Sequence, residues 1–128
     1  MNTHRSVPAQ SISNKEFNHL IIESIQDIKG KNIIKLDMRK LDDSPADFFI
    51  ICQGDSTTQV SSIASNVQKR VKEEFGILPS HVEGKTSQQW VLVDYFSTIV
   101  HVFYPETRSF YELEELWGDA EQISYENL

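Results

Sequence analysis

The segment Asp47–Gln53 constrains the fold of this chain more than any other part of its sequence. It reads DFFIICQ, so that five apolar residues follow one another without interruption from Phe48 to Cys52. The run is far shorter than the ~20 apolar residues that a membrane-spanning helix needs. Its length and composition are typical of a strand that is buried on both faces because helices cover the sheet. We therefore expect a protein built around this central strand.

Two amphipathic helices are predicted, one on each side of the central strand in the sequence. The first covers Asn14–Lys29, where apolar residues recur at helical spacing after a capping box formed by Ser13 and Glu16. The second begins after Ser56, which forms a capping box with Gln59. Its apolar stripe is the most regular in the chain, so this helix is expected to pack on the sheet.

Further strands are predicted from their β-rich composition. Asn32–Met38 alternates in part between apolar and polar residues, which indicates a half-buried strand, and His81–Glu83 forms a short one. Trp90–Phe96 and Thr98–Tyr104 have almost no connector between them and predict an antiparallel hairpin. Its turn, Phe96–Ser97, lacks the Gly or Asn that tight hairpin turns usually contain.

A third helix is predicted after Pro105, with Ser109 and Glu112 as its capping box and Gly118 at its end. Its apolar face is expected to contain Phe110, Leu113, Leu116 and Trp117. The order α-β-β-α-β-β-β-α indicates an α/β (α+β) fold, a mixed five-stranded sheet with three helices. Three helices do not obviously cover both faces of such a sheet, so we expect an exposed apolar face near the hairpin to serve for docking.

The chain of 128 residues is expected to form one domain. Residues 1–12 are polar and lack periodicity, which predicts a flexible N-terminal arm. Residues 13–120 are assigned to the domain and residues 121–128 to an acidic C-terminal tail. The single cysteine, Cys52, excludes an internal disulfide, and no signal peptide or membrane span is visible. A reducing, cytoplasmic location is therefore expected.

The charge of the chain is unevenly distributed. Twelve Lys and Arg against 19 Asp and Glu give a net charge of −7, and residues 106–128 hold seven acids and a single base. This balance argues against a classical nucleic-acid binder, which needs Lys and Arg to contact phosphates. The acidic C-terminal segment could steer the chain toward a basic protein, or it could be a solvated, solubilising stretch.

No group of residues establishes a catalytic site. Gly54–Ser56 lies between a strand and a helix start, where it could hold an anion or form a tight turn with a helix cap. A nucleotidyltransferase needs paired carboxylates for two metal ions, whereas the hairpin strand offers Asp94 alone. Asp94 and His101 could form an acid–base pair or a plain cross-strand polar pair. The histidines lack ligand-like spacing, so we expect no metal site. Because none of these groups establishes a catalytic site, we also expect no catalytic residue and no cofactor.

Several segments follow one another in the order and spacing of a known family. They are Ser44–Ile51, Gly54–Val60, Val82–Gly84, Trp90–Tyr95, Val100–Phe103 and Phe110–Ala120. Together they resemble the ribosomal silencing factor family, also called iojap-like proteins, over about Leu20 to Ala120. No single motif is diagnostic, but the ordered series is specific.

The resemblance implies a nucleotidyltransferase-like fold with no known catalytic role. It implies binding to the large ribosomal subunit through large-subunit protein fourteen, a basic protein beside an intersubunit bridge, with little direct nucleic-acid contact and no membrane. Occupying that site would block joining of the small subunit and repress translation when nutrients are scarce. Mitochondrial relatives assist large-subunit assembly, and members are often homodimers off the ribosome. A role in assembly therefore stays open, as does an enzyme that uses Gly54–Ser56 and Asp94.

The partner surface implied by the resemblance involves the hairpin and the last helix, where aromatic residues gather either as core or as interface anchors. The expected contact residues are Trp90, Leu92, Asp94, Tyr95, His101, Phe103, Tyr111, Glu112 and Glu115. The apolar members would supply buried contact, and the acids would face Lys or Arg of the partner. Phe96–Ser97 stand where members commonly carry Gly-Asp, so a contact made by that acid would be lost or shifted here.

Overall fold

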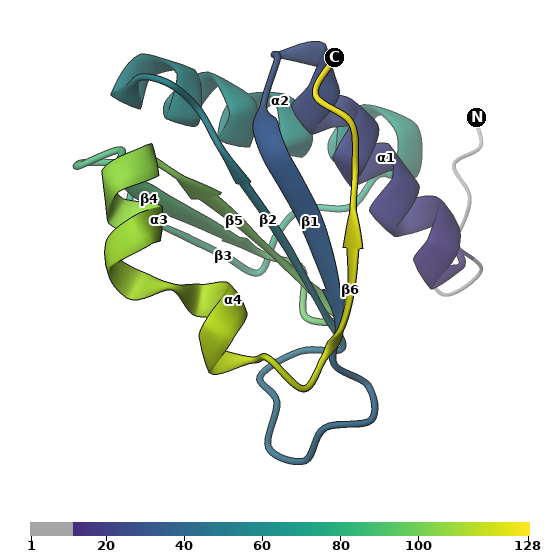
Figure 1. Cartoon of the computed structure of the whole chain (residues 1–128). Coiled ribbons are helices and arrows are strands. Elements are labelled where there is room, and N and C mark those ends of the chain that lie inside the picture. Colours follow the sequence, from purple (N-terminus) through teal and green to yellow (C-terminus); the bar gives the residue numbers. More distant parts are fainter. Residues whose placement is uncertain (1–11) are drawn as a thin grey trace, which may run out of the picture.

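The computed structural model describes residues 12–128, and the chain folds into an open mixed sheet with helices on both faces (Figure 1). The strand order is β3-β4-β5-β2-β1-β6. The strands are β1 (Lys31–Asp37), β2 (Phe48–Gln53), β3 (His81–Glu83), β4 (Trp90–Asp94), β5 (Thr98–Phe103) and β6 (Glu121–Ser124). The helices are α1 (Asn14–Asp27), α2 (Thr57–Phe75), α3 (Pro105–Tyr111) and α4 (Leu113–Leu116). The predicted arm lies outside the described residues except for Ile12, which packs against the core.

Strand β2 occupies the centre of the sheet, as its apolar run predicts. It pairs parallel with β5 on one side and antiparallel with β1 on the other. Phe48–Cys52 is buried throughout, because side chains alternate between the two faces of a strand and both faces of β2 are covered. The predicted hairpin is confirmed as well, since β4 and β5 pair antiparallel from Trp90 opposite Phe103 to Asp94 opposite Ile99.

Helices α1 and α2 cover one face of the sheet, and both begin near their predicted caps. The capping box of Ser13 and Glu16 is complete. At α2, Ser56 accepts a hydrogen bond from the Gln59 amide at 3.1 Å. The Gln59 side chain, however, accepts from the amide of Asp55 instead of Ser56, so this second box is only half formed. Gly76 ends α2 with a φ of 68°, a left-handed conformation that glycine adopts without strain.

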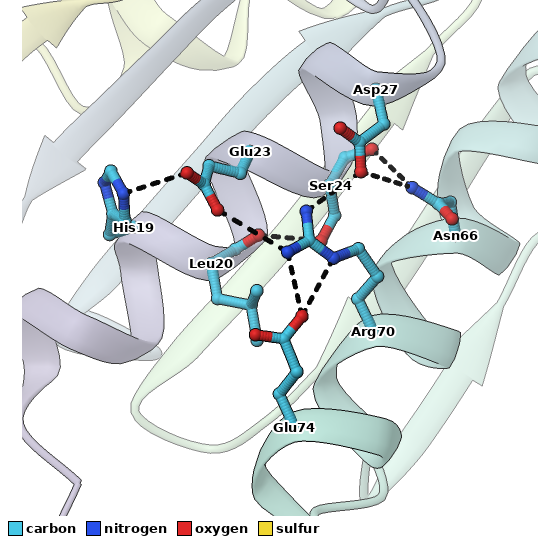
Figure 2. Close-up of polar contacts among 8 residues, drawn as sticks. All are labelled: His19, Leu20, Glu23, Ser24, Asp27, Asn66, Arg70 and Glu74. Atoms are coloured by element: carbon cyan, nitrogen blue, oxygen red, sulfur yellow. Dashed lines mark hydrogen bonds and ion pairs between the residues drawn. The ribbon is translucent and has the colours of Figure 1, made fainter.

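Polar contacts tie α1 to α2 at the outer surface of this layer (Figure 2). The guanidinium of Arg70 on α2 lies 2.9 Å from Asp27 of α1 and 2.8 Å from Glu74 of its own helix. Beside it, the Asn66 amide nitrogen donates to the Ser24 carbonyl at 2.8 Å. Arg70 has acids on both helices, so it joins the two helices at their outer surface.

The third predicted helix is present but divided into α3 and α4, which cover part of the other face. Helix α3 begins at Pro105, directly after β5, because the fixed φ of proline suits the first helical position and its missing amide costs nothing there. Ser109 therefore lies inside α3, and the prediction that it forms a capping box with Glu112 is wrong. Glu112 adopts a left-handed φ of 47° and separates the two helices. Phe110, expected on the buried face, is 79% exposed.

The C-terminal segment is part of the sheet, so the prediction of five strands and a separate tail at residues 121–128 is wrong. Glu121–Ser124 pairs antiparallel with β1 along its outer edge (Figure 1). The Tyr125 amide then donates to the Ile33 carbonyl at 2.9 Å, and the Tyr125 side chain packs against the core. Every side chain of β6 is exposed, so the strand carries no alternating apolar pattern that sequence reasoning could detect.

Within residues 12–128, no helix has both the length and the apolar character that crossing a membrane requires.

Candidate partner-binding surface

Trp90 links the sheet to α3 and stands at the centre of the candidate surface. Its ring stacks on Phe103 of β5 with centroids 4.8 Å apart. The ring also contacts Tyr111 of α3, with centroids 4.9 Å apart. Trp90 is half-buried, so one part of the indole packs in the protein while another part reaches solvent.

The backbone beside Trp90 depends on Gly84. This glycine has a φ of 88°, and a Cβ added to it would collide with the Trp90 carbonyl. Glycine therefore allows the loop between β3 and β4 to pass close to the Trp90 backbone. The segment Val82–Gly84, one of those that carry the family resemblance, thus helps to place Trp90.

His101 lies beneath Trp90 and is only 3% exposed. The indole nitrogen of Trp90 donates a hydrogen bond to Nδ1 of His101 at 3.0 Å. Burial lowers the pKa of His101 from 6.5 to about 3, so the imidazole is neutral at pH 7. Because Nδ1 accepts, the proton resides on Nε2, which is buried and has no hydrogen-bond partner among the described residues.

Arg108 anchors α3 to the sheet. Its Nη1 donates to the Asn32 carbonyl at 2.7 Å and to the Gln53 side chain at 3.1 Å. Its Nε donates to Glu114 of α4 at 3.2 Å, and only 10% of the Arg108 side chain is exposed. One side chain thus joins α3, α4 and the ends of two strands, and it holds the two short helices at a set angle.

Exposed aromatic side chains lie beside Trp90, and exposed acids follow along α3 and α4. Phe110 is 79% exposed and Tyr111 is 52% exposed, and their rings pack edge to face at 5.0 Å. A groove of about 520 Å³ runs between Trp90, Tyr111 and Glu106. Glu112 and Glu115 are exposed beside Arg108. We call this set the α3 surface: Trp90, Glu106, Phe110, Tyr111, Glu112 and Glu115.

The predicted contact residues divide into an exposed and a buried group. Trp90, Leu92 and Asp94 are half-buried on one face of β4, whereas Tyr111, Glu112 and Glu115 are exposed. Tyr95, His101 and Phe103 are buried, at 6%, 3% and 0% exposure. These three side chains are buried in this structure, and their direct contact with a partner stays a prediction.

The alternation of β4 explains why Tyr95 is buried. Tyr95 follows Asp94 and points to the opposite face, where its ring meets Phe17 of α1 at 5.2 Å. His101 and Phe103 point toward the α3 surface but lie under Trp90. Phe110 was expected on the buried face because the predicted helix was started at Ser109. Pro105 is the signal that could have placed that start correctly.

Asp94 and His101 do not form the pair that their neighbouring strands suggest. Asp94 lies opposite Ile99, whereas Leu92 lies opposite His101. The Asp94 carboxylate instead accepts from the Phe96 amide at 2.7 Å and so stabilises the hairpin turn. His101 bonds to Trp90, so neither the acid–base pair nor the cross-strand pair is formed.

The Gly54–Ser56 turn uses its polar groups internally. Its amides donate to the Phe103 carbonyl and the Gln59 side chain, and Ser56 caps α2. Asp55 pairs with Lys31 at 2.7 Å. This arrangement favours the turn-and-cap interpretation over an anion site.

Cys52 is fully buried, and burial raises the pKa of its thiol to about 12, as expected of an unreactive core residue. Over residues 12–128, no cluster of three or more His, Cys, Asp or Glu could hold a metal ion.

The acidic charge of the C-terminal segment is divided between two sides of the molecule. Glu106, Glu112 and Glu115 belong to the α3 surface, but β6 carries Glu121 to the edge of the sheet beyond β1. Glu114 is paired with Arg108. Only part of the charge that the sequence places after Pro105 therefore lies near the hairpin.

The fold and the α3 surface define an open-sheet α/β protein that presents aromatic and acidic side chains on one face. The family model RsfS, described as "Ribosomal silencing factor during starvation", matches residues 11–128. The chain belongs to this family, and the resemblance inferred from its sequence is confirmed.

Individual relatives agree with this assignment. The ribosomal silencing factor RsfS of Halalkalibacterium halodurans is 38% identical over 117 residues, which are 91% of this chain and 98% of the relative. A crystal structure of a Chromobacterium violaceum protein matches with a TM-score of 0.79 at 43% identity, over 84% of this chain and 88% of that one. A mouse protein named "Mitochondrial assembly of ribosomal large subunit protein 1" is 37% identical over 73 residues, which are 56% of this chain and 32% of that protein.

Proposed function

We propose that this protein binds the large ribosomal subunit through large-subunit protein fourteen and sterically blocks joining of the small subunit. The observation that carries the proposal is the family match over residues 11–128. By occupying a site beside an intersubunit bridge, the protein would repress translation when nutrients are scarce. The action is one of binding and exclusion, with no bond made or broken.

The α3 surface supports a basic protein as the partner. Exposed aromatic side chains such as Phe110 and Tyr111 are the residue types that dominate binding energy at protein interfaces. Glu106, Glu112 and Glu115 are exposed on α3, α4 and the turn between them, and would complement Lys or Arg of the partner. The net charge of −7 disfavours extensive contact with RNA phosphates.

Sedimentation of isolated large subunits with added protein tests the proposal. We expect the unsubstituted protein to migrate with the large subunit, and its absence from that fraction would overturn the proposed function. A variant carrying Glu106→Lys and Glu115→Lys should bind roughly tenfold more weakly, because like charges would face each other.

The matched control carries the same change of charge away from the α3 surface, as Glu73→Lys on α2 and Glu126→Lys near the C-terminus. Both of these side chains are exposed. The control should bind like the unsubstituted protein. Equal affinity of the two variants would show that the α3 surface is not the binding site.

A role in assembly of the large subunit is the second candidate, and the name of the mouse relative favours it. The two roles share a binding site but differ in what accumulates when the gene is deleted. Accumulation of precursor particles of the large subunit supports assembly. A normal subunit profile, with excess joining of subunits during starvation, supports silencing.

A further inference from the structure

The hydrogen bond between Trp90 and His101 joins a surface side chain to the buried core. His101 is surrounded by rings: Phe49 lies 4.4 Å away, Phe103 lies 6.3 Å away, and Trp90 lies above it. An apolar ring would pack equally well among these aromatic side chains. The imidazole is therefore present for a reason other than filling space.

The imidazole also brings a buried polar atom that nothing satisfies. His101 Nε2 has no partner among the described residues, and a buried N–H without an acceptor destabilises the folded state. Within residues 12–128 the ring makes one hydrogen bond, which Nδ1 accepts from Trp90. Trp90 is thus the side chain that gains a hydrogen bond from the presence of His101.

The contacts of Trp90 explain what this bond adds. Stacking on Phe103 and contact with Tyr111 limit the position of the indole plane, but ring stacking is compatible with rotation or flipping within that plane. A hydrogen bond to Nδ1 is directional and is made in one orientation of the indole only. The bond therefore selects one orientation of a side chain that reaches solvent.

We propose that His101 is a positioning residue, which holds the Trp90 indole in one orientation so that Trp90 and Tyr111 form a preorganised contact for the protein partner. The part that concerns the partner rests on the proposed function. Fixing a contact side chain before binding removes part of the entropy that association would otherwise lose. His101 thus contributes to affinity although it is buried and touches no partner.

The first test needs no ribosome. In a Trp117→Phe background, Trp90 is the only tryptophan, and its fluorescence anisotropy decay reports the mobility of its indole. His101→Phe should add a fast local motion of Trp90, whereas His101→Asn should restore the restricted decay because its Oδ1 can accept at about the position of Nδ1. Identical decays for the Phe variant and the parent would overturn the proposal.

The second test is a double-mutant cycle measured by binding to large subunits. His101→Phe should weaken binding about five-fold, the loss expected for one hydrogen bond, while His101→Asn binds within about two-fold of the unsubstituted protein. In a Trp90→Phe background, His101→Phe should have no further effect. An equal loss in both backgrounds would mean that His101 acts only on the fold, and would overturn the proposal.

Urea unfolding separates positioning from stability. His101→Phe removes the unsatisfied Nε2, so its midpoint should equal or exceed that of the unsubstituted protein even though binding is weaker. A midpoint lowered in proportion to the lost affinity would overturn the proposal. If the unsubstituted protein fails to bind large subunits, the proposed function falls, and the anisotropy measurement alone decides whether His101 holds Trp90.

Discussion

Phe96 adopts a backbone conformation that its side chain disfavours. It has a φ of 71° in the turn between β4 and β5, and its ring is 77% exposed. The left-handed region costs roughly 1–2 kcal/mol for a residue with a Cβ. The hydrogen bond from the Phe96 amide to Asp94 stabilises this turn. The strain at Phe96 is therefore offset by its hydrogen bond to Asp94.

Replacing Phe96 by Gly should stabilise the protein. Glycine relieves the strain but is more flexible in the unfolded chain, so we expect a net gain of about 0.5–1 kcal/mol in the free energy of unfolding, measured with urea. Phe96→Ala serves as the control because it removes the exposed ring and keeps the Cβ. Gly and Ala variants of equal stability would contradict the strain argument.

His101 should make stability depend on pH. Its pKa is lowered from 6.5 to about 3 by burial, so the unfolded chain takes up a proton in this range that the folded chain does not. Stability is therefore lost as the pH falls below about 6.5, by up to about 1.4 kcal/mol per pH unit until the pH nears 3.

The measurement compares urea midpoints of the unsubstituted protein and His101→Phe between pH 7 and pH 4. Groups common to both proteins cancel in the difference, which should grow in favour of the Phe variant as the pH falls. A difference that does not change with pH would rule out burial of a neutral imidazole.

At the scale of elements, α3 and α4 depend on Arg108 more than on apolar packing. Leu113 is the single buried apolar residue of the two helices, whereas Arg108 bonds to Asn32, Gln53 and Glu114. Glu112 makes the turn between the two helices, and the Arg108 bonds tie both helices to the sheet. The order of the α3 surface therefore follows from a polar anchor.

Arg108→Met should lower the free energy of unfolding by about 2 kcal/mol, because it leaves a half-buried carboxylate and two acceptors without their donor. In the Arg108→Met variant, the backbone amides of α3 should exchange hydrogen with solvent faster than those of α2. Lys40→Met is the control: its ion pair with Glu121 is exposed on both sides and should change stability by less than about 0.5 kcal/mol. Similar losses for both variants would contradict the anchoring role.

At the scale of the whole molecule, the C-terminal strand covers the outer edge of β1 and becomes the edge strand of the sheet. Strand β1 carries the apolar residues Ile33, Ile34 and Leu36, and β6 pairs with its backbone (Figure 1). An unpaired strand edge of this kind is a template for pairing with another chain. Residues 121–124 thus cover the apolar strand β1 with a short strand whose side chains are all exposed.

A chain truncated after Ala120 should therefore be less stable and should associate as its concentration rises. Sedimentation velocity across a range of concentrations measures the association, and hydrogen exchange measures the loss of protection in β1. Truncation after Tyr125 is the control, because it keeps β6 and the Tyr125 bond to Ile33. A monomeric 1–120 chain with protected β1 amides would contradict this role.

Features that depend on nearby residues could be predicted from the sequence, whereas features that depend on distant residues could not. The apolar run of β2, the stripe of α2 and the β4–β5 hairpin arise from local patterns, and each was predicted with close boundaries. The start of α3 was misplaced because Ser109 and Glu112 have the spacing of a capping box, whereas the helix begins at Pro105. Strand β6 was missed because its pairing depends on β1, more than 80 residues away, and its side chains are all exposed.

The sequence alone determined the central strand, the two long helices, the uneven charge and the family, because apolar periodicity and an ordered series of segments can be read without contacts. Only the tertiary structure decided which aromatic residues reach solvent. Strand alternation turns Tyr95 to the far face, and pairing places His101 and Phe103 beneath Trp90. Residue type predicts that a side chain can bury area, but the register of neighbouring strands decides on which side it does so.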